Sequence, residues 1–188
     1  MTIPGGEGIE AGSLGLHHIE TVGRDSVGHR RVHRVSNPCT LKINELVVGV
    51  TSTDVLFHIG ADETNANLPP GSRLERISQH LIQQRSYYPL FPAAPMMNMD
   101  LKKMDQWKMP IRPDLLILPS KLTSFARTVL DSTVVVNPGH LSRDTVGGSY
   151  ATMEVHPIKR ETLENAGGDD VEMLHSAQER TIVEIKRI

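Results

Sequence analysis

Two short, uninterrupted apolar runs constrain the fold of this 188-residue chain more than any other feature. They read DLLILP, residues 114–119, and STVVVNP, residues 132–138. Such runs are typical of strands that are buried on both faces, as the central strands of a parallel sheet are. Between the runs, Ser120 is placed to cap a helix, and apolar side chains follow it at helical spacing. These side chains are Leu122, Phe125, Ala126, Val129 and Leu130.

A strand, a helix and a strand within about 25 residues predict a βαβ unit, with parallel strands joined by a right-handed crossover. The fold class is therefore α/β. Upstream, residues 39–50 read CTLKINELVVGV, which predicts a hairpin with a tight turn at residues 44–45. A helix is expected next, with Ser52 or Thr53 as its N-cap and its end at Gly60.

The clearest helix signal begins at residue 72. Ser72 and Glu75 have the spacing of a capping box, in which each side chain bonds the backbone N–H of the other. An apolar stripe at helical spacing follows. Its members are Leu74, Ile77, Leu81 and Ile82.

A segment rich in proline and aromatic residues follows that helix. RSYYPLFPAAP, residues 85–95, holds three prolines within seven residues, which favours an extended path. Tyr87, Tyr88 and Phe91 stand out in a chain with only 4% aromatic residues. They could stack nucleic-acid bases, but an apolar strap packed over the core is favoured, with these residues as a candidate interface. The methionine-rich residues 96–110 are either a pliable contact surface or a loop.

Two segments near the C-terminus alternate between apolar and polar residues. GGSYATMEVHP, residues 147–157, and RTIVEIKRI, residues 180–188, predict half-exposed antiparallel strands. The acidic stretch ENAGGDDVEML between them predicts a surface loop. The two glycines before the first strand indicate close backbone packing.

Composition excludes several classes of function. The net charge of -2 lacks the excess of positive charge that is typical of proteins that bind nucleic acid directly. The single cysteine, Cys39, excludes an internal disulfide framework. No apolar run approaches a membrane span or a signal peptide. We therefore expect a soluble intracellular chain without contact to a membrane. Residues 1–30 are rich in glycine and charge and are expected to be a flexible leader, whose histidines lack the companions of a metal site.

The loop after the second apolar run is the strongest candidate for a reactive site. Asn137, Pro138, Gly139 and His140 follow a predicted central strand, where α/β proteins place reactive groups. A catalytic metal pair needs several Asp, His or Asn ligands, and His140 stands without them. No Gly-x-Ser-x-Gly elbow, phosphate-binding loop or dinucleotide fingerprint occurs. The residues therefore favour a structural turn, with no metal, cofactor or catalytic residue.

Four segments carry a resemblance to a known family. They read SNPCTLKINELVVGVTSTDVLFHIGADE, ISQHLIQQRSYYPLFP, RPDLLILPSKLTSFARTV and VVVNPGHLSRDTVGGSYATMEV. In this order and spacing they resemble the B subunits of DNA polymerase alpha, which are non-catalytic subunits of the polymerase–primase complex. The likeness runs from about Val32 to Ile188, and the strap is among its most diagnostic parts.

The resemblance implies the C-terminal half of a calcineurin-like phosphoesterase fold, with mixed sheets flanked by helices, at residues 31–188. Active members of that fold end in a Gly-His-x-His loop that supplies metal ligands. The comparable loop here is Gly139, His140, Leu141 and Ser142, which implies a degenerate site. The family commonly has arginine where His140 stands. The family's N-terminal half has no counterpart here, so we expect a truncated form, or a fragment whose remainder is encoded elsewhere.

The implied function is that of a scaffold in the initiation of DNA replication, not an enzyme. Its implied partner is the C-terminal region of the catalytic subunit of DNA polymerase alpha, and through it primase. Contact with DNA is expected only through the complex, and the implied location is the nucleus. The alternatives are a metal-dependent phosphoesterase, which His140 alone disfavours, and an accessory subunit of polymerase delta or epsilon, which the strap disfavours.

Overall fold

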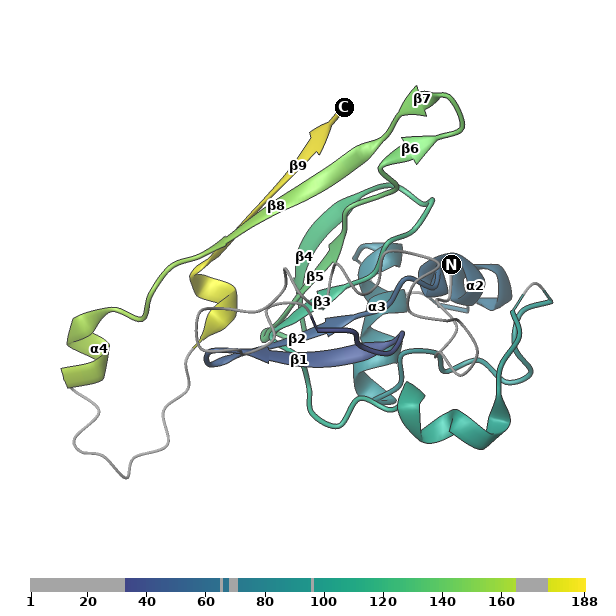
Figure 1. The fold of residues 1–188 in the computed structure, drawn as a ribbon, viewed down its shortest axis with the longest axis horizontal. Coiled ribbons are helices and arrows are strands. Elements are labelled where there is room, and N and C mark those ends of the chain that lie inside the picture. Colours follow the sequence, from purple (N-terminus) through teal and green to yellow (C-terminus); the bar gives the residue numbers. More distant parts are fainter. Residues whose placement is uncertain (1–32, 65, 68–70, 96, 165–175) are drawn as a thin grey trace, which may run out of the picture. The chain divides into compact units, whose positions relative to one another are not determined.

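A five-stranded sheet forms the centre of the fold (Figure 1). The computed structural model describes residues 33–64, 66–67, 71–95, 97–164 and 176–188. Residues 38–188 form one compact unit, which contains all of the described helices and strands. The expected leader, residues 1–30, and most of the acidic stretch, residues 165–175, lie outside the described residues.

The middle of the sheet is parallel. Strand β3 (Leu115–Ile117) lies between β2 (Leu46–Val50) and β5 (Thr133–Asn137) and runs parallel to both. The register pairs Leu115 with Val134, so the two apolar runs are neighbours, as the sequence predicts. Antiparallel strands β1 (Cys39–Ile43) and β4 (Phe125–Val129) complete the order β1-β2-β3-β5-β4. The predicted hairpin is confirmed, since β1 and β2 are joined at residues 44–45.

The helix predicted after Ser120 is wrong. Its apolar residues form β4, which pairs antiparallel with β5, so the parallel strands are joined by a loop and a strand. The Asn137 side-chain amide donates to the carbonyl oxygens of Leu122 (3.3 Å) and Thr123 (3.2 Å), which a helix would need as its own acceptors. The Ser120 hydroxyl accepts from the Leu122 N–H at 3.1 Å and so forms a local turn.

Helix α2 (Val55–Asp62) is capped by a residue other than those predicted. Its N-cap is Asp54, whose Oδ1 accepts from the Phe57 N–H at 3.1 Å. Oδ2 of the same carboxylate accepts from the Lys121 N–H at 2.9 Å, so one side chain bonds both the first turn of α2 and the loop after β3. The helix also continues two residues beyond Gly60, whose carbonyl accepts from Arg73 Nη2 at 2.6 Å.

Helix α3 (Arg73–Gln83) begins after Ser72, as predicted, but the Ser72 side chain makes no capping hydrogen bond. Its apolar stripe is confirmed, since Ile77, Leu81 and Ile82 are buried. Together α2 and α3 cover one face of the sheet (Figure 1).

The sheet has an apolar cluster on each face. On the helical face, Leu116, Leu118 and Val135 pack with the buried residues of α2 and α3. On the other face, Leu115, Val134 and Val136 form a smaller cluster. The alternation follows from the period of two in a strand. It explains why both runs are apolar throughout.

A long hairpin lies against the second face. Strands β8 (Ser149–Val155) and β9 (Thr181–Arg187) pair antiparallel, which confirms the alternating prediction. Ala151 and Val183 pack on the smaller cluster. Gly148 fits where a Cβ would collide with the carbonyl of His140, so the predicted close backbone packing is found. The remaining elements are η1 (Leu101–Trp107), β6 (Ser142–Arg143), β7 (Val146–Gly147), α4 (Arg160–Glu164) and η2 (Ala177–Glu179).

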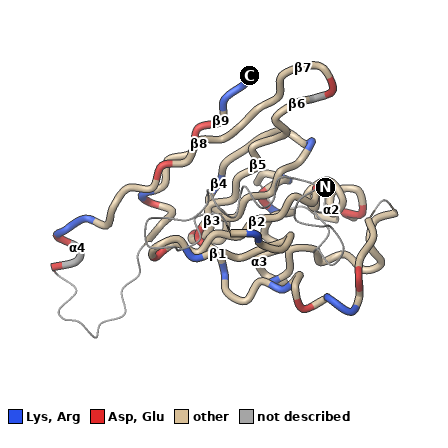
Figure 2. Tube along the Cα trace, viewed as in Figure 1, with Lys and Arg blue, Asp and Glu red and all other residues tan. Residues whose placement is uncertain are grey.

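Charged residues are absent from the three parallel strands of the sheet. Figure 2 shows acidic and basic residues interspersed along η1 and along the β8–β9 hairpin, whereas the parallel strands β2, β3 and β5 carry neither. Within the described residues, no helix is long and apolar enough to cross a membrane.

Substitution of Val135 by aspartate tests the central position of β5. Val135 is 0% exposed and lies between β3 and β4, so the carboxylate would be buried without a partner. We expect a loss of about 3–5 kcal/mol in the free energy of unfolding, measured by urea denaturation. Val146→Asp is the matched control, because Val146 is 67% exposed. An equal, small effect of both substitutions would contradict the assignment.

Candidate functional site

The carboxyl ends of the three parallel strands bring three loops to one edge of the sheet. Residues 51–54 follow β2, residues 118–124 follow β3 and residues 138–140 follow β5. This edge is where open α/β sheets place their ligand sites. The structure therefore puts the loop that the sequence singles out at the expected location.

Asn137 holds two of these loops together. Its side chain is fully buried, and Oδ1 accepts from the N–H groups of Ser120 and Gly139, each at 2.9 Å. Its Nδ2 donates to the carbonyls of the β3–β4 loop, as described above. Both polar atoms of the amide are thus engaged within the protein. A side chain used in this way is a structural link and is not presented to a ligand.

Pro138, Gly139 and His140 form a turn that is tied to β8. The Ser149 hydroxyl donates to the Pro138 carbonyl at 2.7 Å, and the Ser149 N–H donates to the His140 carbonyl at 2.8 Å. Gly139 has φ of 78°, and a Cβ there would collide with the Ser149 hydroxyl oxygen. The backbone of the turn is therefore fixed, while His140 itself is an exposed residue.

The edge offers no set of metal ligands in the part of the chain that the structure describes. No group of three or more His, Cys, Asp or Glu side chains comes together there. Asp54, an acidic residue of these loops, engages both carboxylate oxygens with the backbone N–H groups of Phe57 and Lys121.

Tyr87 and Tyr88 of the strap lie in the core, with 1% and 4% exposure. The Tyr87 hydroxyl donates to the Cys39 carbonyl (3.1 Å) and is 2.7 Å from Thr40 Oγ1, which joins the strap to β1. Burial raises the pKa of this phenol above its usual value, against the Thr40 hydrogen bond that lowers it. A Cβ at Gly49 would stand 2.6 Å from the same hydroxyl oxygen, so glycine is needed beside it.

Tyr88 closes the strap into a loop. Its hydroxyl accepts from the Ala94 N–H at 3.0 Å and is 3.2 Å from Nδ1 of His58. Its ring meets the rings of His58 and Trp107 edge to face, at 5.8 and 5.7 Å between centroids. Residues 89–93 are thereby held between two fixed points.

Phe91 lies within that loop and is 77% exposed, the largest value among the exposed large hydrophobic residues described. Its peptide bond to Pro92 is cis. The predicted strap over the core is thus confirmed for Tyr87 and Tyr88, which are not available at the surface. Of the three candidate interface residues, only Phe91 is presented to solvent.

The contacts of Asn137 and Tyr88 could not be read from the sequence. An asparagine at the end of an apolar strand signals a turn, but the carbonyls that it binds lie 14 and 15 residues earlier. The three lysines within residues 102–108 lie on the exposed η1 segment or directly after it. One of them, Lys108, is 2.5 Å from Asp105 and lowers the pKa of that carboxyl.

Replacement of Asn137 by alanine tests its role as a link. The change leaves two buried N–H groups, of Ser120 and Gly139, without an acceptor. We expect a loss of about 2–4 kcal/mol in the free energy of unfolding, measured by chemical denaturation. Asn98→Ala is the matched control, since Asn98 is exposed. Equal stability of the two variants would show that the loop does not depend on this amide.

Comparison with known proteins identifies the family of the chain. The family model that matches, at residues 16–127, describes the B subunit of DNA polymerases alpha and epsilon. The chain is 41% identical over 125 residues to the B subunit of DNA polymerase alpha from Mus musculus, which covers 66% of this chain and 21% of the relative. It is 31% identical over 129 residues to the protein of that name from Schizosaccharomyces pombe, covering 65% and 22%.

The match to the B subunit of DNA polymerase alpha from Saccharomyces cerevisiae extends further along the chain. It is 27% identical over 186 residues and covers 80% of this chain and 26% of the relative. The chain thus spans about a fifth to a quarter of the length of these curated relatives. The family model covers more than half of the 188 residues, including β1 to β3, both helices of the core and the strap. The chain belongs to the B-subunit family of DNA polymerases alpha and epsilon.

Proposed function

We propose that this chain acts as a non-catalytic scaffold within DNA polymerase alpha–primase, in the initiation of DNA replication. The observation that carries the proposal is its similarity to relatives named as the B subunit of DNA polymerase alpha, from mouse to yeast. In this proposal residues 31–188 are the C-terminal part of an inactive phosphoesterase-like domain of the calcineurin type. The leader expected at residues 1–30 is kept in this proposal only for residues 1–15, because the family model matches from residue 16.

The loop at residues 137–140 is, in this proposal, a former ligand loop that has become a turn. Its position at the carboxyl end of a central parallel strand supports a catalytic ancestry. Its present contacts support a structural role, because Asn137, Pro138 and Gly139 all bond within the protein. His140 keeps the residue type of a ligand, but three or more ligating side chains do not gather in the described part of the chain.

The proposed partner is the C-terminal region of the catalytic subunit of DNA polymerase alpha, and through it primase. DNA would be reached through the complex, since the chain carries a net charge of -2. The proposed location is the nucleus, where replication of nuclear DNA takes place. Because the chain spans 21% of the mouse relative, the interface is proposed to include surfaces from the rest of that protein.

Phe91 is the residue of this chain that we assign to that interface. It combines a large exposed aromatic ring with a backbone held by Tyr88 and Ala94. A ring presented on a rigid loop loses little conformational entropy on binding, which favours aromatic anchors at interfaces. Tyr87 and Tyr88 contribute indirectly, by fixing the strap on the core.

Replacement of Phe91 by alanine tests the interface. A hybrid protein is made in which this chain replaces the matching segment of the full-length mouse relative. The affinity of the hybrid for the C-terminal region of the catalytic subunit is measured by calorimetry. We expect Phe91→Ala to raise Kd about tenfold or more, which corresponds to about 1.4 kcal/mol.

Ile182→Ala is the matched control, because Ile182 is an exposed apolar residue on β9 at 50% exposure. It should leave Kd unchanged. Binding that is insensitive to Phe91→Ala removes this residue from the interface. Failure of the parent hybrid to bind the catalytic subunit overturns the proposed function itself.

The non-catalytic character has a separate test. We expect no hydrolysis of a nitrophenyl phosphate ester by the purified chain with added manganese, because the described residues gather no metal-ligand set. The assay records release of nitrophenol, and His140→Ala is run beside the parent. Manganese-stimulated hydrolysis that disappears in His140→Ala would instead support the metal-dependent phosphoesterase.

A further inference from the structure

The β8–β9 hairpin is a sheet of two strands only (Figure 1). It packs by its face on the five-stranded sheet, through Ala151 and Val183. Among the described residues, neither strand pairs with a strand outside the hairpin. A two-stranded sheet is marginally stable alone, and its unpaired backbone groups can accept a further strand. The two edges of this hairpin are therefore candidate sites of assembly.

The ladder of the hairpin determines which backbone groups of β9 face outward. The Ile188 N–H donates to the Gly148 carbonyl (3.1 Å), and the His156 N–H donates to the Arg180 carbonyl (2.8 Å). Bonded and non-bonded pairs alternate along an antiparallel ladder. The even-numbered residues of β9 therefore bond to β8, and the odd-numbered residues direct their backbone groups to the outer edge.

The outer edge of β9 is open. The backbone groups of Val183, Ile185 and Arg187 make no hydrogen bond outside the hairpin among the described residues. The outer edge of β8 is partly occupied, because the Ser149 N–H donates to the His140 carbonyl at 2.8 Å. Of the two edges, β9 therefore presents the more open one.

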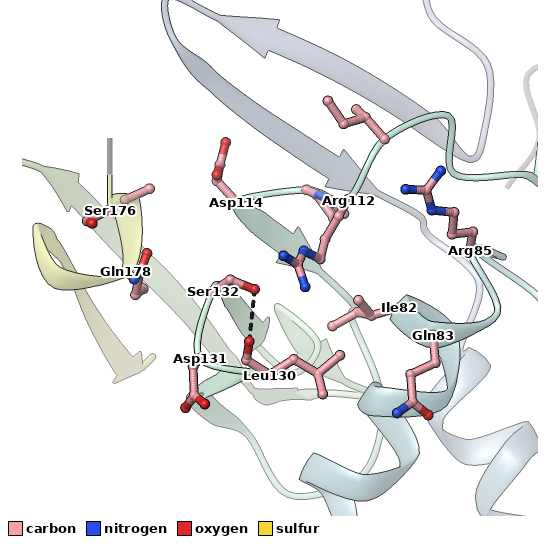
Figure 3. A pocket seen from close by; sticks show the side chains of 13 residues that line it. Ile82, Gln83, Arg85, Arg112, Asp114, Leu130, Asp131, Ser132, Ser176 and Gln178 are labelled. Carbon is pink, nitrogen blue, oxygen red and sulfur yellow. Dashed lines mark hydrogen bonds between the residues drawn. The ribbon is translucent and has the colours of Figure 1, made fainter. Parts of the chain in front are cut away.

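A cavity of about 760 Å³ lies at the base of the hairpin, lined by η2 and by residues that precede β3 and β5 (Figure 3). Its two arginines do not share one binding position. Figure 3 shows the Arg112 side chain directed toward Ser132 and Leu130, away from Arg85. No residue of β9 lines the cavity. The cavity is therefore not part of the edge that β9 offers.

The side chains of β9 favour a second copy of the same strand as the occupant of this edge. Glu184 and Lys186 are exposed and lie 2.9 Å apart on one face. When two copies pair antiparallel about a two-fold axis at Ile185, Glu184 of each copy stands opposite Lys186 of the other. Ile182 (50% exposed) then stands opposite Ile188 (65% exposed). All of these are non-hydrogen-bonded pairs of the new ladder, in which side chains come closest.

Charge selects this register. A shift of the pairing by two residues in either direction would place Glu184 against Glu184 or Lys186 against Lys186. Like charges directly opposite each other are destabilising. The outer edge of β8 offers no such match, since its one charged residue is Glu154. The charge pattern therefore favours β9 against β9, in a contact that uses the same surface of both copies.

We propose that β9 is a self-association edge, at which two copies of this chain pair antiparallel and form one sheet in the order β8-β9-β9-β8. The odd-numbered residues of β9 supply the backbone hydrogen bonds, and Glu184 and Lys186 fix the register. β9 contributes 7 residues, against roughly 20–30 per partner in a standard interface, so the dimer is weak. The edge uses neither Phe91 nor the 137–140 loop, and it does not depend on the proposed scaffold role.

Sedimentation equilibrium of the full chain tests the pairing through matched charge variants. We expect the parent chain to dimerise with Kd in the micromolar range. Glu184→Lys and Lys186→Glu each place like charges opposite each other and should raise Kd about tenfold or more. Glu164→Lys is the matched control, because it reverses an exposed charge that pairs with Arg160 on α4, and it should change Kd by less than about twofold.

A mixture of the two single variants separates the pairing from folding defects. With Glu184→Lys in one copy and Lys186→Glu in the other, every cross-strand pair again joins opposite charges. The mixture should therefore associate with a Kd close to that of the parent. Absence of this mixed dimer, or an equal loss in Glu164→Lys, contradicts the pairing. A parent chain that stays monomeric at about 1 mM overturns the proposal and leaves the edge to a strand of another protein.

Amide hydrogen exchange identifies the edge that is used. In the dimer the outward N–H groups of Val183 and Ile185 are bonded, so their exchange should slow about tenfold when most of the chain is dimeric. The N–H groups of Ala151 and Met153, on the outer edge of β8, are the control and should exchange at an unchanged rate. Slower exchange at Ala151 and Met153 instead, or at neither edge, overturns the assignment to β9.

Discussion

The parallel pairing of β3 with β2 and β5 is the constraint on which the rest of the structure depends. These strands bury side chains on both faces, so each face needs a cover. Helices α2 and α3 cover one face, and the β8–β9 hairpin packs on the other through Ala151 and Val183. The same parallel pairing brings the loops that follow all three strands to one edge of the sheet.

A single buried side-chain amide, that of Asn137, connects the loops at the carboxyl edge of the sheet. Asn137 ends β5 and uses its oxygen and nitrogen to hold the β3–β4 loop and the Gly139 turn. A buried amide with both ends bonded is stable only while its partners stay in place, since unpaired buried groups are costly. The edge is therefore locked by internal hydrogen bonds, which suits a scaffold better than a site that must exchange ligands.

The sequence predicts those elements whose signals are local. The β1–β2 hairpin, the apolar stripe of α3 and the alternating strands β8 and β9 all follow from period and turn chemistry. For β4 the local signal is misleading, because Leu122, Phe125 and Val129 have helical spacing. What overrides this spacing is the distant Asn137, which takes the carbonyls of residues 122 and 123. Likewise, α2 runs past Gly60 to Asp62, and the Gly60 carbonyl accepts from Arg73, which lies 13 residues further along the chain.

The candidate sites show the same division between local and distant causes. The 137–140 loop can be located from its place after an apolar strand, and the lack of companion ligands favours its role as a turn. Tyr87 and Tyr88 are buried whereas Phe91 is exposed, and the two tyrosines are held by contacts with Thr40, His58 and Ala94. The hydrophobic periodicity of the sequence does not reveal these contacts. In this fold the carboxyl edge of the sheet, where ligands usually bind, is instead held together by hydrogen bonds within the protein.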